Sequence, residues 1–149
     1  MKFDNGPKIR VEIQMSNGAM LSSRLFLSDT FSCTGATPPL IEWLSQYSKG
    51  KSTPLPLFCG SSFQQDVMKA LSQIPFGKTI TYGKLAEACS HPKAARAVGT
   101  ACKKNPFPLF IPCHRVIQHN GKIGGFAYGE EIKRRILDYE AERLSAPNK

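Results

Sequence analysis

The chain has 149 residues, of which 41% are hydrophobic and 21% are charged, a balance typical of a globular protein with a buried core. No apolar run approaches the roughly 20 residues that cross a bilayer, and the first residues lack the apolar stretch of a secretory leader. The five cysteines are odd in number and widely spaced, which fits neither a disulfide framework nor a zinc site. We therefore expect a reducing compartment and no membrane partner.

The net charge of +9 is concentrated in the second part of the chain. Residues 1–60 carry six Lys and Arg against four Asp and Glu, whereas residues 61–149 carry fourteen against seven. No acidic residue occurs from Ala88 to Gly129, a stretch that contains six Lys and Arg. A basic stretch is often only a solvated face, but carboxylates repel phosphates, so their absence over this length favours a nucleic-acid partner.

The first third of the chain predicts a small sheet and a helix. Residues 9–15 alternate apolar and polar side chains, which is the period of a strand with one buried face. Asn17-Gly18 favours a tight hairpin turn, so we expect residues 20–27 to return as an antiparallel strand. Residues 37–47 predict a helix that opens on a pair of prolines, a common start for a helix.

A connector rich in Ser, Pro and Gly follows at residues 49–56. We place a domain boundary there and expect a supporting α/β domain at residues 1–55, in which we find no catalytic signal. Residues 56–149 form the second expected domain. The expected fold class is α/β, with a small antiparallel sheet and a helix followed by a mostly helical, winged-helix-like domain.

The second domain is predicted from helical spacing and turn residues. Residues 61–74 form a helix with serine at its N-terminal cap. Residues 84–89 and 93–104 predict two short helices around the turn Ser90-His91-Pro92, and residues 131–144 predict a last helix. Two short helices joined by a tight turn indicate a helix-turn-helix, a common DNA-binding motif.

The second of these short helices is unusually poor in bulky side chains, since Ala94 and Ala95 are followed by further Ala, Gly and Thr. Small residues permit close packing of helices, and they also let a helix lie deep in a narrow groove of DNA. Arg96 is the one long side chain in that run.

The sequence Ile-Pro-Cys-His-Arg-Val at residues 111–116 places a thiol beside a base. The thiolate is the reactive form of cysteine, and an adjacent histidine such as His114 is one way to remove the proton of Cys113. A single cysteine is more often a small buried side chain, so this pair alone leaves both interpretations open.

Four blocks in the same order resemble the O6-alkylguanine-DNA alkyltransferases. They read IPFGKT at residues 74–79, TYGKLA at 81–86, AARAVG at 94–99 and NPFPLFIPCHRV at 105–116. The resemblance extends from about Phe63 to Leu144, which is more than half of the chain.

Members of that family move an alkyl group, chiefly methyl, from guanine O6 onto one of their own cysteines and act once per molecule. The resemblance thus implies a methylated-DNA–protein-cysteine methyltransferase whose partner is double-stranded DNA carrying O6-alkylguanine, with O4-alkylthymine as a further substrate. It implies a monomer without cofactor, in the cytoplasm at the nucleoid or in a eukaryotic nucleus. Some members bind zinc in their N-terminal domain, but residues 1–60 contain no His and only two Cys, so we expect no metal.

The resemblance assigns roles in the reaction to five residues. Cys113 attacks the alkyl carbon, His114 takes the thiol proton through a bound water, and Glu140 orients the histidine. Tyr82 donates toward N3 of the guanine, and Asn105 braces the turn around the cysteine. From the residues alone, the other acids of the last helix are equally good partners for the histidine.

The resemblance also places a DNA-binding surface and a pocket. Arg96 matches the arginine that family members insert into the base stack, in the space of the extruded guanine. The other expected DNA contacts are Tyr82, Ala94, Ala95, Lys103, Lys104 and Arg115. The expected pocket is formed by Cys102, Pro108, Val116, Ile123, Phe126, Ala127 and Lys133.

The loop at residues 121–129 departs from the family, because Phe126 replaces a tyrosine and Tyr128 replaces a glycine; we expect the second change to narrow the pocket. Three alternatives remain. A lesion-binding protein without transfer activity carries tryptophan in place of Cys113, so the thiol argues against it. A helix-turn-helix regulator leaves Cys113, His114 and Glu140 without a purpose. A thiol hydrolase needs an acyl substrate and does not explain the acid-free basic stretch.

Overall fold

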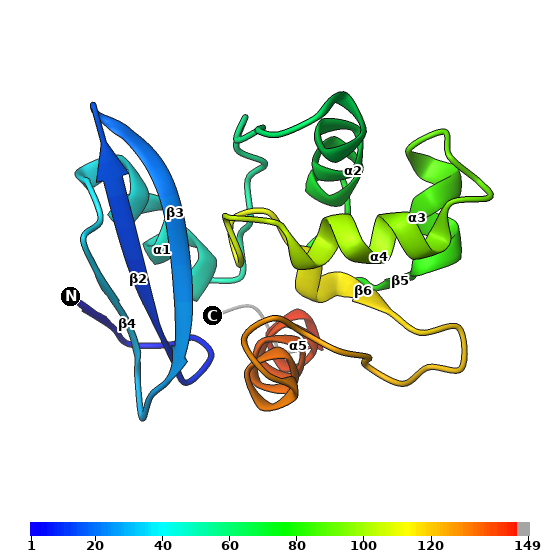
Figure 1. The fold of residues 1–149 in the computed structure, drawn as a ribbon. Helices are drawn as coiled ribbons and strands as arrows, with labels where there is room; N and C mark the ends of the chain where they lie inside the picture. The colour runs from blue at the N-terminus through cyan, green and yellow to red at the C-terminus, as the bar shows by residue number, and fades with distance from the viewer. Residues whose placement is uncertain (146–149) are drawn as a thin grey trace.

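The computed structural model describes residues 1–145, and a small sheet lies beside a larger helical part (Figure 1). The sheet has the order β1-β4-β2-β3. Its strands are β1 (Lys2–Phe3), β2 (Ile9–Ser16), β3 (Ala19–Leu27) and β4 (Phe31–Thr34). Within residues 1–145, no helix is long and apolar enough to cross a membrane.

The β2–β3 hairpin is antiparallel, as the alternation and the Asn-Gly pair predict. Asn17 and Gly18 have φ values of 51° and 79°, the positive values that a type I′ turn requires. The expectation of a purely antiparallel sheet is corrected, because β4 pairs with β2 in parallel and with β1 antiparallel. After β3, a short loop crosses the sheet, so that β4 lies on the side of β2 opposite to β3. The sheet therefore contains both parallel and antiparallel pairs.

Helix α1 (Pro38–Ser48) packs its aromatic residues into the core beside the sheet. Trp43 stacks on Tyr47 with ring centroids 5.5 Å apart, and Tyr47 also meets Phe31 of β4. The indole nitrogen of Trp43 donates to the carbonyl of Thr53 at 2.8 Å, which fastens the connector to α1. Stacked and tilted aromatic pairs of this kind add to the stability that buried area provides.

The second part contains α2 (Ser62–Ser72), α3 (Tyr82–Ala88), α4 (Ala95–Lys103), the 3-10 turn η1 (Cys113–Arg115) and α5 (Glu130–Ser145). Helices α2 and α3 are capped by the hydroxyls of Ser61 and Thr81, which accept from backbone N–H groups of their first turns. Helices α3 and α4 pack against each other in the region where a helix-turn-helix is expected.

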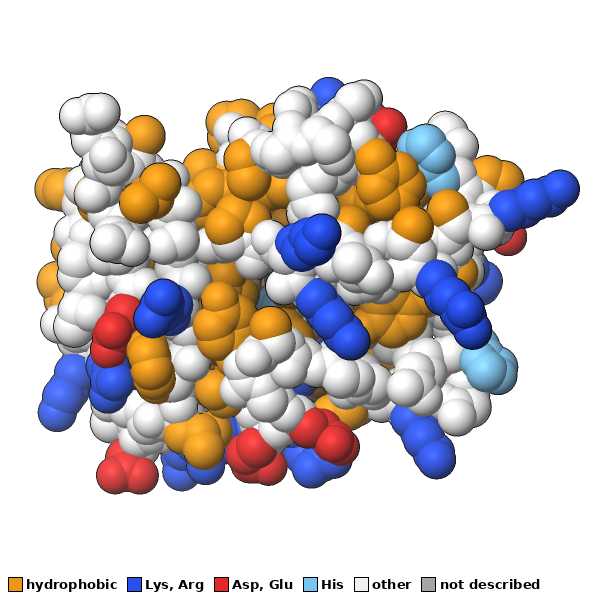
Figure 2. Space-filling model, in the orientation of Figure 1, with side chains coloured by type: hydrophobic (Ala, Val, Ile, Leu, Met, Phe, Trp, Pro, Cys, Tyr) orange, Lys and Arg blue, Asp and Glu red, His pale blue; other side chains and the backbone are white. Residues whose placement is uncertain are grey.

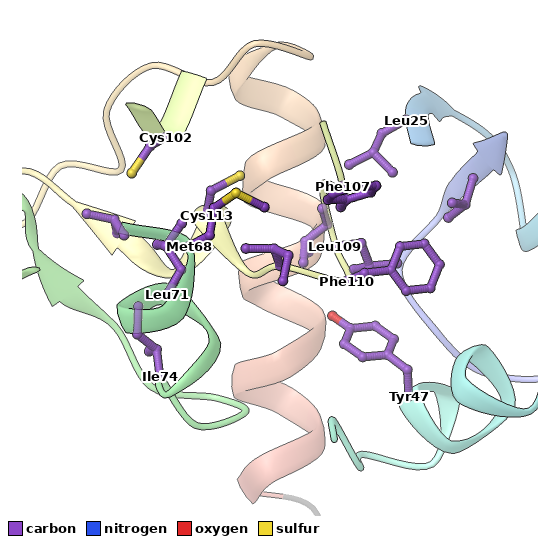
Figure 3. Close-up of a cluster of buried hydrophobic side chains, with 14 of the residues drawn as sticks. Leu25, Tyr47, Met68, Leu71, Ile74, Cys102, Phe107, Leu109, Phe110 and Cys113 are labelled. Atoms are coloured by element: carbon purple, nitrogen blue, oxygen red, sulfur yellow. The ribbon is translucent and has the colours of Figure 1, made fainter. Parts of the chain in front are cut away.

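Two strands that the sequence did not predict connect the helix-turn-helix region to the turn that contains Cys113. Strand β5 (Ile80–Thr81) runs directly into α3 and pairs in parallel with β6 (Val116–Ile117), which directly follows η1. This short pairing holds the start of α3 close to the Cys113 turn. The buried side chains are continuous across both parts of the chain. In Figure 3, Phe107, Leu109 and Phe110 lie between the side chains of α2 and the labelled residues of β3 and α1.

Candidate active site

Cys113 is the first residue of η1 and follows a loop, residues 105–112, that is held by hydrogen bonds of its own Asn105 side chain. The side-chain amide of Asn105 donates to the carbonyl of Ile111 at 2.9 Å, and its oxygen accepts from the N–H of Phe107 at 3.0 Å. Leu109, between these anchors, is buried with a φ of 75°, which an L-residue adopts only where its surroundings enforce it. Asn105 therefore lies where the sequence places a brace.

The Cys113 side chain lines a narrow pocket. The pocket is bounded by Tyr82, Cys102, Lys103, Asn105, Cys113, Gly125, Phe126, Ala127 and Tyr128. The space that a water can enter is about 10 Å³, which is room for about one water molecule. The rings of Phe126 and Tyr128 lie 5.7 Å apart in the loop that forms one wall.

Burial raises the pKa of the Cys113 thiol, while the side chain of Asn105 and the charge of Lys133 act in the opposite direction. Because burial dominates, the cysteine keeps its proton at neutral pH unless a base takes it. Burial likewise raises the pKa of Cys102, the second thiol of the pocket.

His114 is fully buried and is held by Glu140, since its Nε2 lies 2.7 Å from the Oε2 of that carboxylate. An ionised carboxylate can only accept, so Nε2 carries the proton and Nδ1 is the acceptor. His114 Nδ1 is also the only buried side-chain nitrogen or oxygen in residues 1–145 without a hydrogen-bond partner. Burial lowers the pKa of His114 and outweighs the opposite influence of Glu140, so the ring is neutral at pH 7 and can take a proton.

Glu140 lies on α5 with only 1% of its surface exposed and receives five donors. Its Oε2 accepts from Tyr47, His114 and Arg115, and its Oε1 accepts from Arg115 and the N–H of Gly77. Burial by itself would raise the pKa of Glu140, but the charges and hydrogen bonds of His114 and Arg115 hold it well below its usual value. The structure thus selects Glu140 from the acids of α5, and it remains ionised.

The structure corrects the prediction that Arg115 contacts DNA. Arg115 is 2% exposed, and its guanidinium binds both oxygens of Glu140, the carbonyl of Ile74 at 2.7 Å and the hydroxyl of Ser52. A buried carboxylate needs a positive partner, and Arg115 provides it with the two-pronged geometry that arginine favours. Because this side chain is buried, it cannot reach a phosphate of DNA.

Tyr82 and Lys133 both lie close to the Cys113 thiol, and the Nζ of Lys133 is 6.0 Å from the centre of the Tyr82 ring. Tyr82 is the first residue of α3 and lines the pocket, and burial, followed by the proximity of Cys102 and Cys113, raises its pKa to about 12. Its phenol therefore stays a hydrogen-bond donor at physiological pH. The Nζ of Lys133 is buried and donates to the carbonyl of Val116 at 2.7 Å and of Gly125 at 3.5 Å, so it ties η1 to the loop of the pocket.

Cys102, Phe126 and Ala127 line the pocket where the sequence places them. The other four predicted pocket residues do not line this pocket. Pro108 accepts a hydrogen bond from Ser23, Val116 is a buried strand residue, and Lys133 donates to the backbone carbonyls of Val116 and Gly125. Ile123 lines a different, open groove beside the start of α5.

Ser23 of β3 is a support that sequence reasoning missed. Its N–H donates to the carbonyl of Pro106 at 2.9 Å, and its hydroxyl donates to that of Pro108 at 3.2 Å. Its own carbonyl accepts from the hydroxyl of Tyr128 at 3.3 Å. One strand residue therefore anchors both the Asn105 loop and the pocket loop, and nothing in its local sequence signals that role.

The outer face of α4 is basic and carries mostly small side chains. Val98, Ala101 and Cys102 face the core, whereas Arg96, Lys103 and Lys104 are exposed and Ala94 and Ala95 are half-buried. Figure 2 shows Lys and Arg side chains along α4. Within residues 1–145, no three His, Cys, Asp or Glu side chains lie close enough together to hold a metal ion.

A family model described as "6-O-methylguanine DNA methyltransferase, DNA binding domain" matches residues 62–142. A methylated-DNA–protein-cysteine methyltransferase of Methanosarcina mazei is 49% identical over 85 residues, which cover 57% of this chain and 54% of the relative. The chain thus matches about half the length of that relative. A protein of the same name from Mycobacterium bovis is 36% identical over 141 residues, which cover 87% of this chain and 86% of the relative.

Solved structures agree with these sequence matches. The crystal structure of Mycobacterium tuberculosis OGT in complex with DNA has a TM-score of 0.69 and 32% identity, covering 90% of this chain and 94% of that one. The likeness includes the sheet and α1 as well as the helical part, because nearly the whole of each chain is covered. The chain belongs to the methylated-DNA–protein-cysteine methyltransferase (O6-methylguanine DNA methyltransferase) family.

Proposed function

We propose that this protein repairs O6-alkylguanine in double-stranded DNA by transferring the alkyl group irreversibly to Cys113. The observation that carries the proposal is the Cys113 thiol on the wall of a pocket, followed directly in the chain by the neutral base His114, which is hydrogen-bonded to the ionised Glu140. The order thiol, histidine and carboxylate is the arrangement that activates a nucleophile in hydrolase triads.

In the proposed step, the thiol proton passes to Nδ1 of His114 through a water, since that nitrogen makes no direct hydrogen bond to the thiol. The sulfur forms a bond to the alkyl carbon while the bond from that carbon to guanine O6 breaks. The electron pair of the broken bond stays on the guanine, which then takes up a proton. Glu140 stabilises the positive histidine, because the carboxylate already accepts from its Nε2 at 2.7 Å.

The leaving guanine gains negative charge, so hydrogen-bond donors around it lower the barrier. Tyr82 is suited to this role because its phenol lines the pocket and keeps its proton. The backbone N–H of Ala127, in the opposite wall, is our candidate donor to O6. Asn105 has a positioning role, since its amide braces the loop before Cys113.

Guanine O6 lies inside the base stack, so the reaction requires the base to leave the helix. We assign DNA binding to α3 and α4, with the small-residue face of α4, including Ala94 and Ala95, in the minor groove. Arg96 is exposed on α4 and is the proposed wedge that fills the space of the guanine. Lys103 and Lys104 are the proposed phosphate contacts.

The reaction needs no cofactor, since the thiol is the acceptor and the alkylated base is the donor. A thioether is a poor leaving group, so each molecule acts once. We propose that the protein acts as a monomer at the DNA of the cytoplasm or nucleus. O4-alkylthymine is the proposed second substrate, and residues 1–55 and 56–149 are the proposed domains.

The test is incubation with duplex DNA that contains O6-methylguanine labelled in the methyl group. We expect at most one label per protein, found by peptide mapping on Cys113. Label on Cys102 or Cys89 would overturn the assignment of the nucleophile. Sustained turnover would indicate a hydrolase-like reaction, and binding without transfer would indicate a lesion-binding protein or a regulator.

A further inference from the structure

Tyr47 connects the sheet-containing part of the chain to the reaction centre. It lies on α1, is fully buried, and its hydroxyl donates to Oε2 of Glu140 at 2.6 Å across 93 positions of sequence. We propose that Tyr47 is a positioning residue for the proposed alkyl transfer, which holds the Glu140 carboxylate in the orientation that His114 needs. The inference rests on the proposed function, and it makes the N-terminal part of the chain a component of the proton-transfer machinery.

The geometry around Oε2 supports this role. Three donors meet at that one oxygen: Tyr47 at 2.6 Å, His114 at 2.7 Å and Arg115 at 3.0 Å. A carboxylate that accepts at every available position cannot rotate without breaking several bonds at once. The hydrogen bond from Tyr47 is the shortest of the five on Glu140 and comes from a different element than the other side-chain donors.

The ring of Tyr47 is held on several sides. It stacks on Trp43 with an interplanar angle of 8°, meets Phe76 edge to face at 5.5 Å, and contacts Phe31 and Tyr139. A side chain packed in this way presents its hydroxyl in one direction only. The aromatic cluster therefore fixes the donor, and the donor fixes the carboxylate.

The Tyr47 hydroxyl is needed to hold the Glu140 carboxylate, whereas packing in the aromatic cluster requires only the ring. Phenylalanine would fill the same space without a polar group to satisfy. Burial, and next the negative charge of Glu140, raise the pKa of Tyr47 well above its usual value. Tyr47 therefore donates at every pH at which the protein works.

Loss of this hydrogen bond should change the titration of His114. The charges and titratable groups that face His114 and Glu140 are Cys113, Arg115, Lys133, Tyr47 and Tyr139. If only the Tyr47 hydroxyl is removed, Oε2 carries more negative charge toward the ring and stabilises its protonated form. His114 then has to lose its proton at a higher pH before it can act as a base.

The experiment compares the wild type with Tyr47→Phe by measuring the rate of Cys113 benzylation by free O6-benzylguanine across the pH range in which histidine titrates. We expect the acid limb of the Tyr47→Phe profile to move upward by about half a pH unit. A residue that only supports the fold would change thermal stability but not the midpoint of this limb.

Tyr139→Phe is the matched control. Tyr139 lies in the same aromatic cluster, and its hydroxyl donates to the backbone carbonyl of Tyr47 at 2.9 Å, but it makes no hydrogen bond to Glu140. We expect its acid limb to coincide with that of the wild type. An unchanged or lowered midpoint in Tyr47→Phe, or an equal rise in both variants, would overturn the proposal.

The same three proteins are treated with iodoacetamide over the same pH range, and alkylation of Cys113 is followed by peptide mapping. This reaction needs the thiolate but no guanine, so it reports on the base even if the proposed repair function is wrong. If the wild type fails to react with O6-alkylguanine in DNA or as free base, the proposed function fails. An upward shift with iodoacetamide in Tyr47→Phe alone would still support the role of Tyr47.

Discussion

The surroundings of Cys113 and the outer face of α4 are close together in the fold but are built in opposite ways. Around Cys113, the neutral His114 and the charged Arg115 and Glu140 are buried, and both His114 and Arg115 bind Glu140. On α4, the charges of Arg96, Lys103 and Lys104 point to solvent. The buried charges need fixed partners in the protein because water cannot reach them, and the exposed charges need none.

This difference separates two sets of expected effects. Changes in the buried centre should affect transfer with every substrate, and several should also affect folding, because they leave a charge or polar group without a partner. Changes on α4 should affect only the DNA-dependent part of the reaction. Substrates with and without DNA therefore test whether the two regions work independently.

The largest effect is expected for Cys113→Ser. A hydroxyl has a pKa far above neutral and cannot replace the thiolate, so transfer should be lost both from DNA and from free O6-benzylguanine. Affinity for duplex DNA should stay within a few-fold of the wild type, as measured by fluorescence anisotropy. A large loss of DNA affinity would show that the two regions are coupled.

Arg96→Ala tests the exposed face of α4. If Arg96 fills the space of the extruded guanine, this change should slow transfer from duplex DNA by about tenfold or more and leave the reaction with free O6-benzylguanine nearly unchanged. Arg96→Lys should restore only part of the duplex rate, because lysine lacks a planar group that stacks between bases. Equal slowing with both substrates would place Arg96 among the residues that support the pocket.

The buried centre should also give the protein a characteristic pH dependence of stability. The pKa of His114 is lowered in the folded state, so the unfolded chain binds more protons between that value and about 6.5. The free energy of unfolding should therefore fall as pH drops below about 6.5, by up to about 1.4 kcal/mol per pH unit. The carboxylate of Glu140, whose folded pKa is lowered, stabilises the fold above about pH 4.3 and loses that effect only below it.

Urea unfolding at a series of pH values measures this dependence, and His114→Gln provides the comparison. That variant should show a flatter stability curve between about pH 5 and about pH 6.5, because the titrating group is gone. Equal slopes in the two proteins would mean that the pH dependence arises elsewhere. Arg96→Ala should retain the wild-type slope, since an exposed side chain on α4 takes no part in the network.

The smallest effect is expected for single changes of the two lysines at the end of α4. Lys103→Ala and Lys104→Ala should each weaken DNA binding a few-fold and reduce the slope of log affinity against log salt by about 0.9 per lost phosphate contact. Reaction with free O6-benzylguanine should not change. If neither variant changes the salt slope, other residues of the basic stretch must make the phosphate contacts.

Much of the local structure could be predicted from the sequence. The alternation in residues 9–15 and the Asn17-Gly18 turn predict the β2–β3 hairpin, because side-chain period and turn geometry are local properties. Helical spacing and turn residues likewise predict α1 to α5 to within a few positions. The Cys113-His114 pair could be selected because its chemistry is contained in adjacent residues.

The same reasoning failed where a residue is defined by partners far away in the chain. Arg115 lies in a basic stretch and was predicted to bind DNA, but its partners Glu140 and Ile74 come from other elements and bury it. The parallel insertion of β4 next to β2 depends on the packing of the whole sheet rather than on the four residues of the strand.

By itself, the sequence determined the β2–β3 hairpin and the helices α1 to α5, the positions of the thiol and the adjacent histidine, and the basic, acid-free stretch that follows the first short helix. Only the tertiary structure decided that Glu140, rather than its neighbours, orients His114, and that Tyr47 and Arg115 bind the same carboxylate. The physical reason is that periodicity and turn propensity act over a few residues. A buried charge, in contrast, is stable only when folding brings its partners to it from distant parts of the chain.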